Sequence, residues 1–161
     1  SKPSNTSVPD SWGNKDPVEF QRHFDDHKDD FGSKTPNDYT KQSQDFYKRA
    51  QAEKLPSFEY PKRSGANGIG RTGVYDPKTN EFGVYSADGK TITYYKPDKG
   101  VEYYKDRVNT QVSRGGRIIN QLPESGYPIQ PRPPLYDRPD FGGGGGNRVH
   151  IKPNDVDEVI D

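Results

Sequence analysis

The chain has few aliphatic side chains with which to build a core. Leu, Ile, Val and Phe together account for 27 of its 161 residues, about 17%. A fraction this low is typical of disordered chains, but disorder also goes with a high net charge and few aromatic residues. Here Lys plus Arg and Asp plus Glu are 24 each, and 12% of the residues are aromatic. We therefore expect one domain of about 100 residues with flexible flanks.

Residue types and patterns that the sequence lacks exclude several classes of protein. It has no cysteine, so it has no disulfide framework, no thiol nucleophile and no zinc ribbon. No apolar run approaches the roughly 18 residues that a transmembrane helix needs, so we expect no membrane segment. The polar stretch Ser1–Asn14 does not have the pattern of a signal peptide. Three histidines do not by themselves indicate a metal site, and we expect no cofactor.

The charge is balanced overall but unevenly distributed. Residues 60–120 hold 11 basic and 6 acidic side chains, whereas residues 10–59 and 121–161 each have a net charge of −3. The basic middle segment is the part most suited to a polyanion. Ordinary variation of surface charge is the alternative interpretation.

Two helices are predicted at the start of the folded part. The first begins after Asp16, which is suited to cap a helix, and ends at Gly32, a common C-terminal stop. The second begins after Thr35 in the same way and ends near Glu53. In both, proline occupies the first helical position, where it is favoured. One face of each helix carries residues at spacings of three and four: Phe20, Phe24, His27 and Phe31, then Tyr39, Ser43, Phe46 or Tyr47, and Ala50.

The hydrophobic period then changes from that of a helix to that of a strand. Three short segments are rich in β-branched and aromatic residues: Ile69–Tyr75, Glu81–Ser86 and Lys90–Lys96. Asp88-Gly89, between the last two segments, is a typical hairpin turn. We therefore predict an α+β fold in which two N-terminal helices precede a three-stranded antiparallel meander.

The remaining segments give weaker signals. Phe58 and Tyr60 indicate an extended connection, and Val101–Val108 fits either a short helix or another extended piece. Arg114–Ile119 is expected to form a last strand, and the alternating segment Arg148–Lys152 an edge strand. The expected organisation is a linker over 1–15, a domain over 16–120 and an irregular Pro/Gly-rich extension over 121–161.

His23 and His27 are the first candidates for chemistry. They lie four residues apart and so share one side of the first helix. Histidine titrates near neutral pH and suits general acid–base catalysis. The alternative is packing, with His27 between Phe24 and Phe31 and His23 at the border of that face. The acids around them, Asp25, Asp26, Asp29 and Asp30, are expected to form a solvated face.

Further candidates lie on the predicted sheet. Arg71 follows the glycine-rich run Ser64–Gly70 and suits a phosphate, because guanidinium matches phosphate oxygens bidentately. A flexible loop that enters a strand is the alternative. On the last strand of the meander, alternation places Thr91, Thr93 and Tyr95 on one face, where they can contact a nucleic acid, and Lys96 on the other. The alternative is that Thr and Tyr are simply favourable strand residues.

Two runs of sequence resemble a known family. They are Arg22–Gly32 (RHFDDHKDDFG), continued by Thr35–Tyr39 (TPNDY), and Val74–Val84 (VYDPKTNEFGV), continued by Thr93–Pro97 (TYYKP). In this order and spacing they are similar to effector domains of bacterial polymorphic toxins, such as those of contact-dependent inhibition. These domains resemble the barnase/EndoU/colicin/RelE-like ribonuclease superfamily. Members often have a basic residue before the Thr-Tyr pair, where this chain has Ile92.

The resemblance implies two helices on a small curved antiparallel sheet, with RNA bound on the open face of the sheet. It also implies a secreted or delivered antibacterial toxin that acts in the cytoplasm of the target cell and is neutralised by a cognate immunity protein. The expected reaction is metal-free cleavage of RNA, with tRNA as the expected substrate. Residues expected to act are His23 or His27 in proton transfer, Thr93 and Tyr95 as polar or stacking contacts, and Arg71 and Lys96 on phosphate. A non-catalytic binding module, or a toxin that acts on DNA or NAD, remains the alternative.

Overall fold

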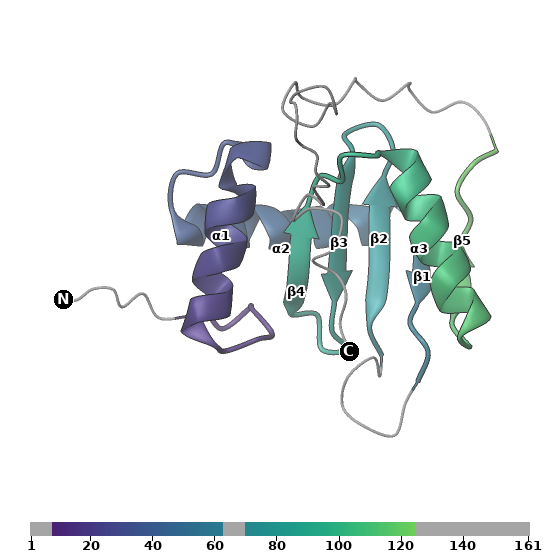
Figure 1. The fold of residues 1–161 in the computed structure, drawn as a ribbon, viewed down its shortest axis with the longest axis horizontal. Helices are drawn as coiled ribbons and strands as arrows, with labels where there is room; N and C mark the ends of the chain where they lie inside the picture. The colour runs from purple at the N-terminus through teal and green to yellow at the C-terminus, as the bar shows by residue number, and fades with distance from the viewer. Residues whose placement is uncertain (1–7, 63–69, 125–161) are drawn as a thin grey trace, which may run out of the picture.

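The computed structural model describes residues 8–62 and 70–124, and within them the fold is α+β, as predicted. The helices are α1 (Pro17–Phe31), α2 (Pro36–Glu53) and α3 (Val101–Ser113). The strands are β1 (Ser57–Glu59), β2 (Thr72–Asp76), β3 (Glu81–Tyr85), β4 (Thr91–Tyr95) and β5 (Arg117–Asn120). They form one antiparallel sheet in the order β4-β3-β2-β1-β5. Helix α2 crosses behind the sheet, α1 lies beside β4, and α3 packs near β5 on the front (Figure 1).

Helices α1 and α2 begin where their caps were predicted. The Asp16 carboxylate accepts a hydrogen bond from the backbone N–H of Val18 at 3.0 Å, and the Thr35 hydroxyl accepts one from Asp38 at 3.0 Å. Each bond satisfies a donor that the first turn of a helix leaves without a partner. Gly32 ends α1 in the left-handed region, at φ 65°. Local capping chemistry therefore sets where both helices begin and where α1 ends.

Replacing Gly32 with alanine is expected to destabilise the fold by about 1 kcal/mol, because a Cβ atom disfavours the left-handed conformation. No atom lies within 4 Å of the position that this Cβ would occupy, so a steric clash would not contribute. Chemical denaturation of the variant measures the loss. Gly32→Asn is the matched control and should lose less, because asparagine tolerates this conformation. An alanine variant as stable as the original chain would contradict this account.

The predicted meander β2-β3-β4 is confirmed, and two further strands extend it. Phe58 belongs to β1, which pairs with β2 on one side and with β5 on the other. The predicted extended connection is therefore an inner strand of the sheet. The last strand is also confirmed, as β5. The segment Val101–Val108, which sequence left open, lies in α3; Gly100 precedes this helix without a side-chain cap, so its start carries no capping signal.

The structure differs from the predicted linker over residues 1–15. Trp12 is fully buried and packs against Phe20 and Tyr39. Its segment runs beside β4: the backbone N–H of Gly13 donates to the carbonyl of Thr91 at 2.7 Å. The Ser/Asn/Pro/Gly composition around Trp12 predicted a linker, although this one aromatic residue packs in the core. The folded part thus includes residues that precede the first helix.

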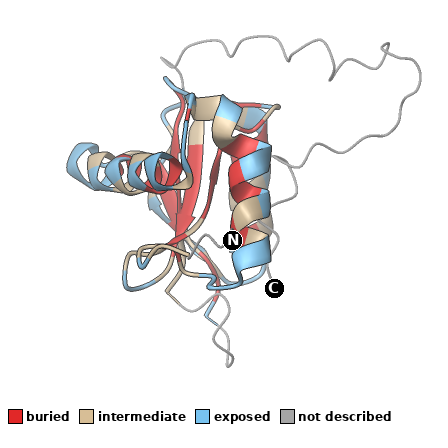
Figure 2. Ribbon diagram, turned by 90° about the vertical axis from the view of Figure 1, so that its left-hand side faces the viewer, coloured by how far each residue is buried: buried red, intermediate tan, exposed pale blue. Residues whose placement is uncertain are grey.

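Aromatic side chains fill both sides of the sheet, which explains how so few aliphatic residues suffice. On the α2 side the buried cluster includes Trp12, Phe20, Phe24, Tyr39, Phe46, Tyr85 and Tyr94. On the α3 side it includes Phe58, Tyr60, Tyr75, Phe82, Tyr95, Tyr103 and Tyr104. Buried residues concentrate in the sheet and on the helix faces turned toward it (Figure 2). Aromatic rings bury large areas of apolar surface, so each replaces more than one small aliphatic residue.

This tyrosine-rich core predicts a loss of stability in alkali. Burial raises the pKa of Tyr85, Tyr94 and Tyr104 above the ordinary value of 10. The unfolded chain ionises these phenols near pH 10 while the folded chain keeps them protonated, so their contribution is complete below that pH and declines above it. We expect the free energy of unfolding to fall by about 2 kcal/mol between pH 9 and pH 10.5. Urea denaturation at both values measures this, and an unchanged midpoint would contradict it.

Candidate functional site

Four of the residues predicted to act lie together where α1 meets β4. The Nδ1 atom of His23 is 3.5 Å from the Thr93 hydroxyl oxygen. The His27 ring stacks on Tyr95 with ring centroids 5.1 Å apart, and the two histidine rings are 5.9 Å apart. We call these residues, together with Tyr103 and Arg107 described below, the histidine cluster. Its first four members come from the two halves of the sequence pattern, more than 60 residues apart.

A shift in strand register selects which β4 side chains reach the cluster. The pairing of β3 with β4 shifts between Val84 and Tyr85, so Thr91 does not share the face of Thr93 and Tyr95. The Thr91 hydroxyl instead meets Ser43 and Gln44 of α2, each at 2.8 Å. The prediction from simple alternation is therefore wrong for Thr91, because a bulge breaks the two-residue period.

Helix α3 contributes two residues that sequence analysis missed. The hydroxyl groups of Tyr95 and Tyr103 form a hydrogen bond. The Arg107 guanidinium carbon lies 5.8 Å from the centroid of the Tyr103 ring, and its side chain is 20% exposed. Tyr103 and Arg107 are four apart and so share one face of α3. The four-residue spacing could have indicated that these two residues lie together, but only if the segment Val101–Val108 had been predicted as a helix.

Asp30 also differs from the predicted solvated face. One of its carboxylate oxygens, Oδ2, is 3.8 Å from Nδ1 of His27 and accepts a hydrogen bond from the backbone N–H of Lys96 at 3.1 Å. Asp30 therefore joins the end of α1 to the end of β4. A carboxylate beside an imidazole can fix the orientation of the ring.

Within the cluster only Arg107 has appreciable exposed surface: the others, His23, His27, Thr93, Tyr95 and Tyr103, are each at most 6% exposed, and the two histidines differ little. The side chain of His27 has no exposed surface, whereas His23 is 6% exposed. His27 is also held by its stack on Tyr95 and by Asp30. His27 is therefore the histidine whose surroundings fix its position.

The two predicted phosphate contacts lie outside the cluster. Arg71 precedes β2 at the end of the sheet where β4 begins, because Thr72 pairs with Tyr85 and Tyr85 with Thr91. Tyr95 lies at the opposite end. The Lys96 side chain lines a cavity on the α2 side, with its Nζ atom 5.6 Å from the Phe31 ring centroid. Most of the glycine-rich run before Arg71, residues 64–69, is outside the described residues.

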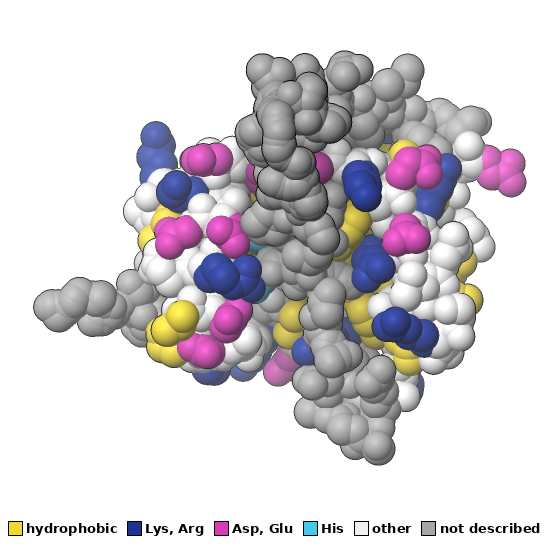
Figure 3. Space-filling view, viewed as in Figure 1, with side chains coloured by type: hydrophobic (Ala, Val, Ile, Leu, Met, Phe, Trp, Pro, Cys, Tyr) yellow, Lys and Arg dark blue, Asp and Glu magenta, His cyan; other side chains and the backbone are white. Residues whose placement is uncertain are grey.

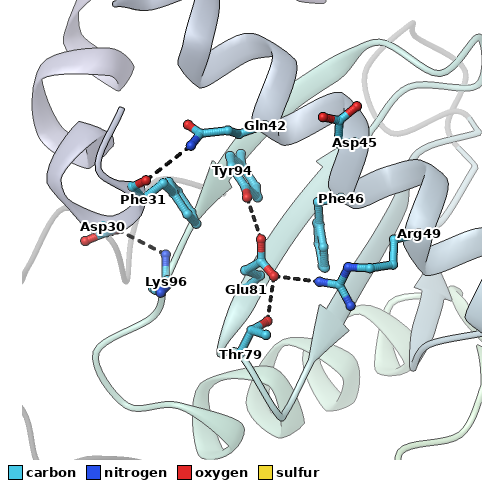
Figure 4. Close-up of a pocket in the computed structure, with 10 residues that line it drawn as sticks. All are labelled: Asp30, Phe31, Gln42, Asp45, Phe46, Arg49, Thr79, Glu81, Tyr94 and Lys96. Carbon is cyan, nitrogen blue, oxygen red and sulfur yellow. Dashed lines mark hydrogen bonds and ion pairs between the residues drawn. The ribbon is translucent and has the colours of Figure 1, made fainter. Parts of the chain in front are cut away.

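The cavity beside Lys96 has a volume of about 480 Å³ and holds an ionic network (Figure 4). The Glu81 carboxylate accepts hydrogen bonds, each 2.6 Å long, from Arg49, Thr79 and Tyr94. Arg49 also binds Asp76 at 2.6 Å. Burial, followed by the charge of Glu81, raises the pKa of Tyr94 well above its ordinary value. Because these groups satisfy one another, the network ties α2 to the sheet and leaves the histidine cluster as the better candidate site.

Comparison with known proteins does not assign the chain to a family. A scan against models of known protein families and a search of curated proteins find no match. Within residues 8–62 and 70–124, no three His, Asp or Glu side chains gather as metal ligands would. No helix in the same ranges is long and apolar enough to cross a membrane.

Proposed function

We propose that the chain is a toxin effector domain that cleaves RNA by general acid–base catalysis, with the histidine cluster as its active site. The observation that carries this proposal is the convergence of His23, Thr93 and the Tyr95–Tyr103 hydroxyl pair from three separate elements. Proton-transfer groups, hydroxyl donors and the cation of Arg107 are thereby within one small region. The sequence resemblance supports the choice of RNA as substrate.

Cleavage of RNA without hydrolysis needs a base, an acid and a positive charge. The base removes the proton of the 2′-hydroxyl, the 2′-oxygen attacks phosphorus, and the bond from phosphorus to the 5′-oxygen breaks. The acid returns a proton to that 5′-oxygen, which leaves a 2′,3′-cyclic phosphate and a 5′-hydroxyl. All atoms and protons of the step come from the RNA and the protein.

The geometry suggests a role for each member of the cluster. His23, next to Thr93, removes the proton of the 2′-hydroxyl and, once protonated, returns a proton to the leaving 5′-oxygen. The buried Tyr95–Tyr103 hydroxyl pair is a positioning pair that joins β4 to α3, and Arg107, 20% exposed, neutralises the charge that develops on the phosphate. His27 is a positioning residue that acts by stacking on Tyr95. Arg71 and Lys96 lie outside the cluster and receive no role at the phosphate.

The biological setting is part of the same proposal. The domain is delivered from one bacterium into the cytoplasm of another, with tRNA as the proposed substrate. A cognate immunity protein protects the producing cell, and an acidic surface on it would complement the basic segment 60–120 and speed association. Growth arrest on cytoplasmic expression, relieved by that protein, is the expected behaviour. Normal growth at verified soluble expression would contradict the toxin assignment.

The direct test is incubation of the purified chain with total tRNA in EDTA. Discrete RNA fragments are the expected result. Parallel incubations with double-stranded DNA and with NAD serve as substrate controls. Intact tRNA that is nevertheless bound by the protein would favour a non-catalytic binding module, and loss of DNA or NAD alone would favour a toxin of another class.

A further inference from the structure

The two edges of the sheet differ in how far other parts of the chain cover them. At the β4 edge, the backbone N–H of Thr91 donates to the carbonyl of Ser11 at 2.8 Å, and its carbonyl accepts from Gly13 at 2.7 Å. Asp30 accepts the N–H of Lys96 at the end of the same strand. Other parts of the chain thus satisfy several backbone groups of this edge. Covering an edge in this way prevents it from pairing with another chain.

The β5 edge has no such cover within the described ranges. Strand β5 pairs with β1 on its inner side and ends the sheet on its outer side. Ile118 and Ile119 are 38% and 42% exposed, and Val112 at the end of α3 is 39% exposed. These are three of the four large hydrophobic residues that are exposed in the described part of the chain; the fourth, Val18, lies on α1. Within the described residues, exposed apolar surface therefore concentrates at the β5 edge.

A hollow of about 260 Å³ lies between α3 and β5, next to this edge. Its walls include the apolar side chains Tyr104, Val108, Ile118 and Leu122, and Lys105 also lines it. Space of this kind suits the side chains of an added strand, which alternate between the two faces of a sheet.

The charge around the edge is positive. Residues 99–120 hold five basic and two acidic side chains. Figure 3 shows Lys and Arg side chains on the α3 side of the molecule, with Asp and Glu side chains among them. Arg114 is exposed, and Arg117 keeps 68% of its side chain exposed while it binds Glu59 at 2.8 Å. Two copies of this chain would bring like charges together at the edge, so a second copy is a poor occupant.

We infer that the β5 edge binds an extended acidic segment of a partner protein, which adds to the sheet as a sixth strand. Backbone hydrogen bonds to β5 would provide the affinity, as in other cases of strand addition. Apolar side chains of the segment would contact Ile118 and Ile119, and its carboxylates would face Arg114 and Arg117. This surface lies on the opposite sheet edge from His23, so the inference does not depend on the proposed function.

The test uses the full chain labelled with ¹⁵N and two blocked eight-residue peptides. One alternates Glu with Val, and the other alternates Lys with Val. The acidic peptide is expected to shift the backbone amide signals of residues 117–120, whereas the basic peptide should not. The Kd of the acidic peptide should rise at least five-fold between 50 and 300 mM NaCl, because salt screens its attraction to the basic edge. Equal binding of both peptides, or shifts centred on β4, would overturn the inference.

Variants locate the contact. Arg114→Glu, at an exposed position, should weaken binding of the acidic peptide about ten-fold, whereas Lys41→Glu on α2 is the matched charge reversal and should not. Thermal denaturation of both variants checks that they fold. Equal weakening by both would show a long-range charge effect and overturn the inference. Sedimentation that shows self-association through β5 would also overturn the inference, because a second copy would then occupy the edge. New shifts of the β5 amide signals on removal of residues 125–161 would overturn it too, because that segment of the chain would then be the occupant.

Discussion

His23→Ala is expected to reduce the rate of RNA cleavage by about 10²–10⁴, the contribution that general acid–base catalysis usually makes. The melting temperature should fall less than with His27→Ala, because His23 keeps 6% of its surface exposed and its contact with Thr93 is long, at 3.5 Å, although its ring also packs on Trp12. Single-turnover cleavage of tRNA, with the protein in excess, measures the chemical step. Circular dichroism on the same preparations measures the melting temperature.

His27→Ala is the comparison for this experiment. His27 is fully buried and stacked on Tyr95, so its removal leaves a cavity and should lower the melting temperature. The two variants should therefore differ: His23→Ala mainly loses activity and His27→Ala mainly loses stability. Equal and large losses of stability in both would mean that neither is a site residue. Proton transfer would then pass to Tyr95 or to His150, which lies outside the described residues.

Arg49→Ala is expected to destabilise the fold by about 2–3 kcal/mol, less than the usual effect of removing one partner of a fully buried ion pair, because the Arg49 side chain is 34% exposed and solvent screens part of the interaction. Arg49 binds both Asp76 and Glu81 at 2.6 Å, and these carboxylates keep only 4% and 15% of their side chains exposed. Without Arg49, two largely buried negative charges lie close together with no cation between them. Urea denaturation at pH 7 measures the loss of unfolding free energy.

Lys41→Ala is the matched control on the same helix. Lys41 also pairs with a carboxylate, Asp45 at 2.9 Å, but both side chains are mostly exposed. Solvent screens such pairs, so this variant should be nearly as stable as the original chain. Equal stability of the two variants at pH 7 would show that the network does not anchor α2.

The parts of the fold that sequence could predict are those fixed by local chemistry. Asp16 and Thr35 cap their helices through hydrogen bonds to residues two or three positions away, so a short window contains the whole signal. The same holds for the turn at Asp88-Gly89. His23 and His27 were identified as candidates because four-residue spacing on a capped helix determines which face they share.

The parts that sequence could not predict depend on contacts distant in the chain. Trp12 is an isolated aromatic residue in a polar stretch, and only its packing on α1 and α2 places it in the core. The bulge opposite Val84 breaks the alternation that placed Thr91 beside Thr93. Tyr103 and Arg107 join the cluster only because α3 packs on the sheet near Tyr95. Periodicity within one element carries no information on such pairings.

The chemical nature of the RNA ends tests the central claim most directly. The chain and its His23→Ala variant are incubated with one purified tRNA in EDTA, and the fragments are analysed by mass spectrometry. The account predicts fragments that end in a 2′,3′-cyclic phosphate and begin with a 5′-hydroxyl, produced by the original chain and nearly absent with the variant. Fragments that begin with a 5′-phosphate, or equal cleavage by both proteins, would contradict it.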